Sequence, residues 1–345
     1  MRILIVAPWF RTLAHLYGRL IVGAGHDVLV VASDRHFEAG YGFCNEIVLG
    51  GLENVVRTGS TTLQTAREVR RFSPEVVLEE PFGHPKWLVL PPKARRILML
   101  HEPDPGRDSA VLDWKRLRRL VRHTQERQIS SVICFSQYAA TIARAAGRSH
   151  VDVVPLISEM PDEWVPRSGE PRHGFAVVGR ISHSKGIDIA VNAWQGLDVT
   201  VRDREPLRLM LSEGEDHSSS VAQWEREGVS VRMGRFSFKD MVSEIGRSRV
   251  MLLPYRSAMQ SGQQILAMQL GVVPIVSNVG GLPEYQPEFL PPVTSLEADL
   301  WTHRMLAELG TDDPKARSER VHDHYLSQVG NAETILAALQ NAILY

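Results

Sequence analysis

The sequence predicts an α/β protein made of two doubly wound domains, and three observations lead to this prediction. Short apolar runs alternate with longer amphipathic runs, which is the pattern of βαβ units and parallel sheets. The apolar runs are continuous rather than alternating, so we expect both faces of each sheet to be covered. The alternation stops in a proline-rich, polar stretch at residues 155–173 and then starts again. That stretch therefore reads as a linker between two domains of similar size.

The expected strands are short and rich in aliphatic and β-branched residues. In the first half they are 2–7, 27–33, 46–49, 74–80, 96–101 and 130–136, with helices expected at 13–25, 63–72 and 111–127. In the second half they are 175–179, 207–211, 229–233, 250–254 and 272–277, with helices expected from residue 187 and at 263–270. The last stretch, 332–345 (AETILAALQNAILY), predicts an amphipathic helix.

Length and composition place the chain among globular proteins. Its 345 residues suit two domains, each able to bury a sizeable core. Lys+Arg 39 against Asp+Glu 40 leaves a formal charge of -1, so no overall field favours nucleic acid. The two cysteines, Cys44 and Cys134, read as free thiols in a reducing compartment. The N-terminal apolar run resembles a first strand rather than a signal peptide, and no run is long enough for a spanning helix. We therefore expect a cytoplasmic protein, or one that rests on the inner face of the membrane.

The loop GRISHSKG, residues 179–186, is the first candidate for a binding site. It directly follows an expected strand and carries two cations, Arg180 and Lys185, between glycines. An arginine can grip a phosphate in a fork, and a lysine adds a point charge. Two solvated loop cations are the alternative, and spacing alone does not separate the two interpretations.

Two further turns follow strands of the same domain. After the strand at 250–254, Ser261 and Gly262 precede a helix, and the N-terminus of a helix favours a phosphate. After the strand at 272–277, the turn NVGGLPE contains Gly280, Gly281 and Glu284. Each turn alone could be an ordinary strand-to-helix connection. Because ligands of parallel sheets bind beyond the carboxyl ends of the strands, the three turns together predict a diphosphate site.

These segments resemble a known family. GRISHSKGID and PYRSAMQSGQQILAMQLGVVPIVSNVGGLPE look like the C-terminal domain of retaining GT-B glycosyltransferases of the large family 4 type, which includes bacterial α-mannosyl- and α-glucosyltransferases. GHDVLVVAS, HEPDP and VICFSQYAATIAR fit its N-terminal domain. The resemblance implies two Rossmann-like domains that face a cleft. It implies an acceptor domain at 1–158, a nucleotide-sugar domain at 173–328 and a final helix, 329–345, that returns to the first domain.

The resemblance also implies an activity and the residues that perform it. A sugar would move, with retention of configuration, from a nucleoside-diphosphate-sugar to a saccharide, lipid-linked or small-molecule acceptor. Arg180 and Lys185 match the cations that neutralise the leaving diphosphate. His101 matches a histidine near the reacting sugar, with a satisfied strand-end histidine as the alternative. The residues implied in donor binding are Gly179, Gln260, Ser261, Gly262, Gly280, Gly281 and Glu284.

The sequence departs from the family pattern in two places. Two glutamates usual in the family are replaced by Ala258 and Leu266, so the chain looks like a subgroup with a Gln-Ser-Gly turn. The first loop, PWFRTLAH, has Phe10 and Arg11 where paired glycines are usual. These departures leave two other classes open, a non-catalytic nucleotide-sugar binding protein and a nucleotide-sugar epimerase or hydrolase.

Metal, cofactor and membrane contacts are the remaining expectations. The histidines that stand beside acids have no ligand spacing, so we expect no metal site and no cofactor other than the nucleotide-sugar co-substrate. The basic amphipathic segment 114–123 (WKRLRRLVRH) is best explained by a core-packed helix with a solvated basic face. A peripheral contact with anionic headgroups is its alternative.

Overall fold

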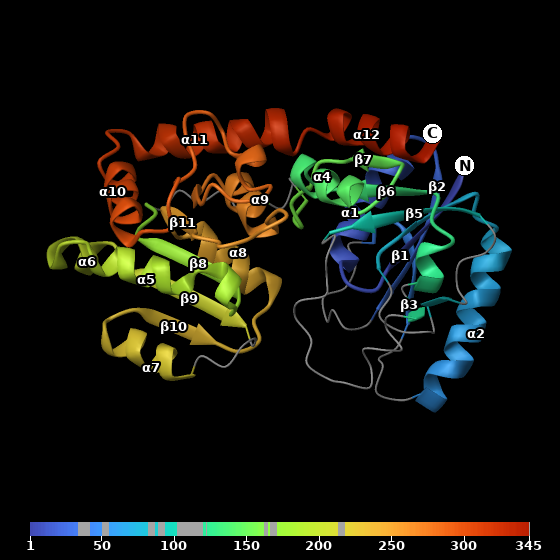
Figure 1. Ribbon diagram of the computed structural model, residues 1–345, viewed down its shortest axis with the longest axis horizontal. Coiled ribbons are helices and arrows are strands. Elements are labelled where there is room, and N and C mark those ends of the chain that lie inside the picture. Colours follow the sequence, from blue (N-terminus) through green and yellow to red (C-terminus); the bar gives the residue numbers. More distant parts are fainter. Residues whose placement is uncertain are drawn as a thin grey trace. The chain divides into compact units, whose positions relative to one another are not determined.

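The computed structural model describes residues 1–33, 42–49, 55–81, 87–88, 94–101, 120–121, 123–161, 165, 171–212 and 218–344. The chain divides into two compact units (Figure 1). The first consists of Met1–Pro155 with Ala332–Tyr345, and the second of Leu156–Asn331. The basic segment 114–123 lies almost wholly outside the described residues, so its two interpretations stay open.

The first unit is built on a parallel sheet whose strand order is β3-β2-β1-β4-β5-β6-β7. Its strands are β1 (Arg2–Ala7), β2 (Asp27–Ser33), β3 (Asn45–Leu49), β4 (Val76–Glu79), β5 (Arg95–Leu100), β6 (Ser131–Cys134) and β7 (Val151–Val153). Its labelled helices are α1 (Arg11–Gly23), α2 (Val55–Phe72), α4 (Gln137–Ala145) and α12 (Ala332–Leu344). The central strand β1 is buried from Ile3 to Ala7, as its continuous apolar sequence predicts.

The last helix is tied to the first unit by a charged group. Helix α12 contacts α1 and β7. The Arg95 guanidinium at the start of β5 donates to the carbonyl oxygens of Ala342 and Ile343, at 3.2 and 2.9 Å. A cation at a helix C-terminus satisfies carbonyls that have no partner within the helix and complements its dipole.

The second unit is built on a parallel sheet whose strand order is β10-β9-β8-β11-β12. Its strands are β8 (Phe175–Arg180), β9 (Leu207–Ser212), β10 (Ser230–Met233), β11 (Val250–Leu253) and β12 (Val273–Val276). Its α-helices are α5 (Ile187–Gln195), α6 (Val199–Arg204), α7 (Ser218–Arg226), α8 (Phe238–Gly246), α9 (Gly262–Gln269), α10 (Ala298–Leu309) and α11 (Pro314–His324). Three shorter turns of helix are η3 (His183–Lys185), η4 (Pro283–Tyr285) and η5 (Tyr325–Val329). The predicted α/β class with two parallel sheets is confirmed.

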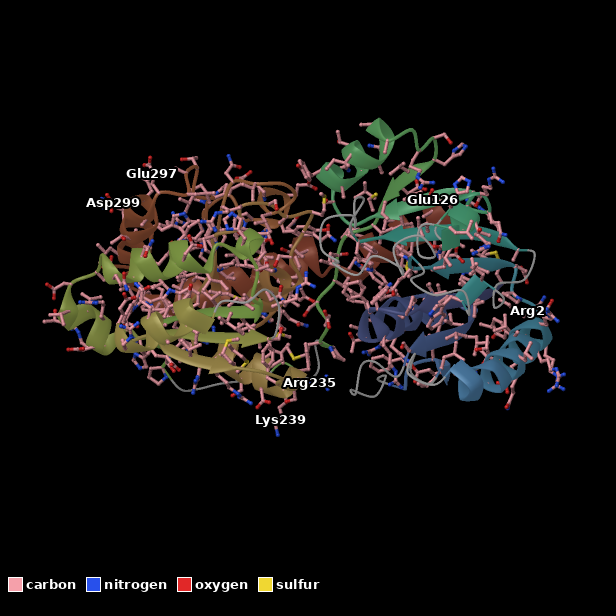
Figure 2. All side chains as sticks on the ribbon, turned by 60° about the horizontal axis from the view of Figure 1, so that its bottom comes forward. Arg2, Glu126, Arg235, Lys239, Glu297 and Asp299 are labelled. Atoms are coloured by element: carbon pink, nitrogen blue, oxygen red, sulfur yellow. The ribbon has the colours of Figure 1, made fainter. Side chains whose placement is uncertain are left out.

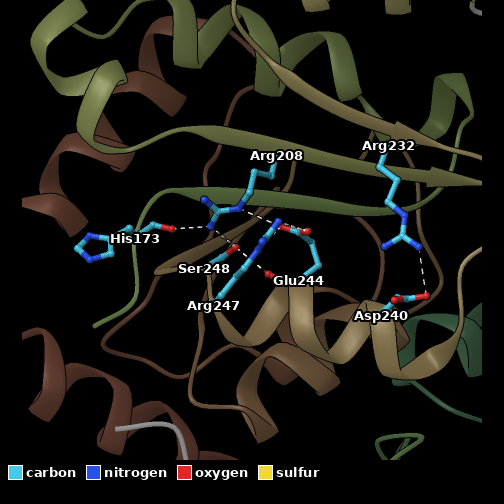
Figure 3. A network of polar contacts seen from close by, with 7 residues as sticks. All are labelled: His173, Arg208, Arg232, Asp240, Glu244, Arg247 and Ser248. Carbon is cyan, nitrogen blue, oxygen red and sulfur yellow. Dashed lines mark hydrogen bonds and ion pairs between the residues drawn. The ribbon is translucent and has the colours of Figure 1, made fainter. Parts of the chain in front are cut away.

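Polar contacts fix helix α8 to the sheet of the second unit (Figure 3). Arg208 of β9 donates to Glu244 of α8 at 2.9 Å and to the Ser248 hydroxyl at 2.9 Å. Arg247 pairs with the same carboxylate. Other charged side chains, such as Arg235 and Lys239, are exposed and project outward (Figure 2). These charged side chains of the second unit thus lie on the surface or join a helix to the sheet, while the strands bury aliphatic side chains.

Candidate active site

The strand orders locate one reversal point in the sheet of each unit. In the second unit the chain runs from β8 outward through β9 to β10, and then returns to β11 on the other side of β8. The reversal point therefore lies between β8 and β11, and ligands of open parallel sheets bind at the carboxyl ends of such strands. The loop with Arg180 and Lys185 follows β8, and the segment from Tyr255 to Ser261 follows β11. Two of the three predicted turns thus flank the reversal point.

Lys185 and Ser261 are joined there through Tyr255, a residue that the sequence analysis did not single out. The Lys185 ammonium donates to the Tyr255 hydroxyl oxygen at 2.7 Å and lies 3.9 Å from the centre of the tyrosine ring. The Tyr255 hydroxyl lies 3.3 Å from the Ser261 Oγ. A strand-end tyrosine is by itself unremarkable in sequence, so no signal could have linked it to a lysine 70 positions earlier.

Backbone contacts hold the loop that carries Lys185 against the segment that follows β11. Gly186 has φ +62°, and a Cβ placed on it would lie 2.0 Å from the Pro254 carbonyl oxygen. The backbone N–H of Arg256 donates to the Ser184 carbonyl at 2.8 Å. Only glycine combines this left-handed conformation with such a close approach. The glycine of the predicted motif therefore sets the distance between the two loops.

Ser261 begins helix α9. It is the N-cap of the helix, its Oγ accepts from the Gln264 backbone N–H, and the side chain is buried. A Cβ on Gly262 would lie 3.8 Å from a carboxylate oxygen of Glu159, so an acid of the chain adjoins this helix end. A helix N-terminus favours negative charge, and a bound phosphate would share this end of the helix with Glu159.

The remaining predicted donor residues fall around the same helix. A Cβ on Gly179 would lie 3.9 Å from Gln263 of α9. Gly280 has φ +58°, and a Cβ there would lie 1.6 Å from the Ala258 carbonyl oxygen. The backbone N–H of Gly281 donates to that same carbonyl at 3.4 Å. The turn after β12 is thereby packed on the segment that precedes α9.

Three predicted side chains are at least partly exposed. Arg180 is the last residue of β8 and is exposed. Gln260, directly before the N-cap, is partly buried. Glu284 is exposed in η4. The predicted site residues of the second unit thus lie on loops that contact one another or on the ends of adjacent elements.

One position of the replaced glutamate pair is closed to ligands. Leu266 in α9 is 2 % exposed and belongs to the core of the second unit, together with Tyr255 and Leu282. The neighbouring Gln264 is fully buried and donates to the Leu282 carbonyl at 2.9 Å. This face of α9 therefore packs inward. Leu266 contributes apolar packing where a glutamate would need a polar partner.

The first unit has its own reversal point, between β1 and β4. Glu80 follows β4 and is 1 % exposed. Its carboxylate accepts from the backbone N–H groups of Trp9 at 2.7 Å and of Phe10 at 3.2 Å, in the loop after β1. The amide groups of that loop are therefore engaged by an acid of the chain itself. The pair of adjacent glutamates at the end of an apolar strand was a sequence signal for this residue.

His101 lies beside Glu80 at the end of β5. Its Nε2 is 3.8 Å from a Glu80 oxygen, and its ring lies between those of Phe10 and Phe135, with centroids 4.1 and 4.3 Å away. Burial lowers the pKa of His101 to about 3. Burial also raises the pKa of Glu80 to about 8, against the opposing effect of the two backbone donors. At neutral pH the imidazole is therefore uncharged.

The expected paired glycines of the first loop are replaced by residues with other partners. Phe10 covers His101, whereas Arg11 pairs with Glu46 of β3, with Nε 2.6 Å from Oε1. The Nε2–H of His15 donates to the same carboxylate at 3.0 Å. These contacts lower the pKa of Glu46 to about 2 although burial opposes them. Arg11 therefore anchors α1 to the edge strand.

Within the described ranges, no group of three or more His, Cys, Asp or Glu side chains could hold a metal ion. None of the helices in the described part of the chain is long and apolar enough to cross a membrane.

Two doubly wound units of this kind define the GT-B fold, and known structures agree. Anabaena HepE in complex with UDP is 14% identical over 100% of both chains, with a TM-score of 0.69. Sucrose-phosphate synthase from Thermosynechococcus elongatus is 16% identical over 100% of this chain and 98% of that chain, with a TM-score of 0.67. The catalytic domain of Arabidopsis thaliana starch synthase IV, bound to ADP and acarbose, is 11% identical over 100% of both chains, with a TM-score of 0.67. At these identities the likeness establishes the fold.

Sequence similarity relates the second unit to a particular family of glycosyltransferases. Residues 172–299 match the family model described as Glycosyl transferases group 1. The matched range contains Arg180, Lys185 and all of the predicted donor-binding residues. A comparison with curated protein sequences gives no significant match. The second unit is therefore similar to group 1 glycosyltransferases over residues 172–299, in a chain with the GT-B fold.

Proposed function

We propose that the protein transfers a sugar from a nucleoside-diphosphate-sugar to an acceptor, with retention of anomeric configuration and without a metal ion. The observation that carries the proposal is the contact of Lys185 with Tyr255 and, through it, with the N-cap of α9, at the reversal point of the group 1 domain. A fixed cation beside a helix N-terminus suits the diphosphate of such a donor.

The chemistry follows from where negative charge develops. As the glycosidic bond to the diphosphate breaks, charge builds on the leaving oxygens, and a pre-placed ammonium stabilises it without reorganisation. Lys185 and Arg180 are proposed to do this, with the backbone of Ser261 and Gly262 as further donors. The cations replace the charge that a metal ion would supply.

Retention is proposed to follow a path on one face of the sugar. The usual acid positions of the family are Ala258 and Leu266 here, so neither provides a carboxylate nucleophile. A leaving phosphate oxygen would then take the proton of the attacking acceptor hydroxyl. His101, uncharged in its buried site, is proposed to contact the reacting sugar by a hydrogen bond rather than by charge.

The acceptor is proposed to be a saccharide. The structure of Anabaena HepE contains UDP, and that of the starch synthase IV catalytic domain contains ADP and acarbose. These bound molecules support a nucleotide donor and a saccharide acceptor for this chain. A lipid-linked or small-molecule acceptor remains a finer proposal that rests on the family resemblance. The family 4 subgroup is a finer proposal that rests on the Gln-Ser-Gly turn of Gln260, Ser261 and Gly262.

A panel of nucleotide-sugars tests the proposal. The protein is incubated with UDP-, GDP-, ADP- and dTDP-sugars, with and without mono- and disaccharide acceptors, and free nucleoside diphosphate and products are measured. We expect slow donor hydrolysis with one base and faster release with an acceptor. Lys185→Ala should lower turnover by about 10²–10³-fold and leave the protein folded. A changed sugar would instead indicate an epimerase, and binding without turnover would indicate a non-catalytic protein.

A further inference from the structure

The position of the Lys185 ammonium depends on one neighbouring side chain. A lysine has four rotatable bonds and no fixed direction of its own. In this structure the ammonium is placed by the hydroxyl of Tyr255 at 2.7 Å and by its ring at 3.9 Å. Tyr255 is itself 3 % exposed and is part of the core of the second unit. A rigid, buried aromatic residue thus holds a flexible, partly exposed cation.

The backbone on both sides of Tyr255 fixes this contact. Before it, the Pro254 carbonyl is in close contact with Gly186. After it, Arg256 donates from its backbone to Ser184 at 2.8 Å and from its guanidinium to the His183 carbonyl at 3.0 Å. The Tyr255 backbone carbonyl also accepts from the Ser277 hydroxyl at 2.6 Å. The tyrosine therefore cannot move without the lysine loop.

The hydroxyl of Tyr255 continues the contact to helix α9. Because an ammonium only donates, the Tyr255 oxygen accepts from Lys185. The Tyr255 hydroxyl also lies 3.3 Å from the Ser261 hydroxyl, and either oxygen can be the donor of this hydrogen bond. One hydroxyl thus aligns the cation of one loop with the N-cap of the next helix.

We infer that Tyr255 is a positioning residue that acts through Lys185, holding the ammonium where it stabilises the leaving diphosphate. The inference rests on the proposed function. Catalysis requires the charge to be in place before the bond breaks, and loss of placement lowers the rate even when the charge remains. Neither the composition nor the spacing of the loop motif reveals this residue.

A double-mutant cycle tests the inference, with the nucleotide-sugar that the panel identifies. Tyr255→Phe keeps the ring and removes the hydroxyl. We expect its kcat to fall about tenfold with the donor KM changed by less than about threefold, the pattern of an interaction made in the transition state. In a Lys185→Ala background the same substitution should lower kcat no further, because Tyr255 then has no cation to place.

Tyr285→Phe is the matched control. Tyr285 is also buried in the second unit, but its hydroxyl accepts from the Leu156 backbone N–H at 2.9 Å. Its removal should lower the unfolding midpoint and leave kcat unchanged. If Tyr255→Phe does not fold, Lys185→Arg makes the test from the other side, since it keeps the charge and alters its placement, and it should also lower kcat.

The kcat values of these variants separate the positioning role of Tyr255 from the proposed function. A wild-type kcat in Tyr255→Phe, or an equal loss in the Lys185→Ala background, would overturn the positioning role while leaving the glycosyltransferase proposal intact. A wild-type kcat in Lys185→Arg would do the same. A wild-type protein that turns over no nucleotide-sugar would overturn the proposed function, and the inference with it.

Discussion

Replacing Gly186 by alanine tests how tightly the lysine loop is held. The residue has φ +62°, where an L-residue costs about 1–2 kcal/mol. The new Cβ would lie 2.0 Å from the Pro254 carbonyl oxygen, and real contacts of this kind stay beyond 3.0 Å. The loop must therefore move by about 1 Å. That movement breaks the Arg256–Ser184 backbone hydrogen bond, which contributes about 0.5–1.5 kcal/mol.

Together these effects predict a loss of about 1.5–3.5 kcal/mol in the free energy of unfolding. Gly228→Ala is the control, because Gly228 has φ +89° and the nearest atom to its Cβ, on Trp194, is 3.8 Å away. It should lose only the conformational part, about 1–2 kcal/mol. Urea unfolding followed by tryptophan fluorescence measures the free energy of unfolding of both variants. The dependence of that free energy on urea concentration is compared first, because the two losses are comparable only if it is the same. Equal losses in the two variants would refute the close contact with Pro254.

Three further outcomes follow from the structure. The folded-state pKa of Glu80 is raised to about 8, so the stability that this group contributes should fall as pH rises from about 4.5 to about 8. When the unfolding midpoint is measured against pH, Glu80→Gln should flatten this decline. An unchanged decline would contradict the prediction. Because the pKa of His101 is lowered to about 3, folding stability should also fall as pH drops from about 6.5 towards 3. Comparing the unfolding midpoints of the wild type and His101→Gln during acid titration checks this fall. Arg96→Met leaves the fully buried Glu79 without its charged partner, although Gln125 still donates to it, and should cost about 3–5 kcal/mol in denaturant unfolding. The additional change Glu79→Met should restore part of this loss, and no recovery would argue against the buried pair.

The fold was predictable because its strands are continuous apolar runs. Strands β1 and β2 coincide with the predicted runs, and the helix after Ser261 begins where the polar turn ends. The three-residue strand β7 was missed, since VDV is short and only half buried. A long apolar run is visible in a sequence. A short edge strand such as β7 forms only through tertiary pairing with β6, which the sequence does not show.

The site was predictable only in part. The glycines and cations after β8 mark a loop that approaches other backbone, and Gly186 does so. The sequence could not show that Tyr255 would reach Lys185, because the contact arises from the adjacency of β8 and β11, strands far apart along the chain. Glu80 was recognised only as part of a strand. Its role depends on the amide groups of the loop after β1, which carry no sequence signature.

Nucleotide binding is the most direct test of the account. Titration calorimetry with UDP, GDP, ADP and dTDP should find one diphosphate that binds the wild-type protein, with the corresponding monophosphate weaker. The Kd of that diphosphate should rise at least tenfold in Lys185→Ala, because a charge-assisted contact is lost. Failure of all four to bind, or equal affinity for the wild type and Lys185→Ala, would contradict a diphosphate site between β8 and β11.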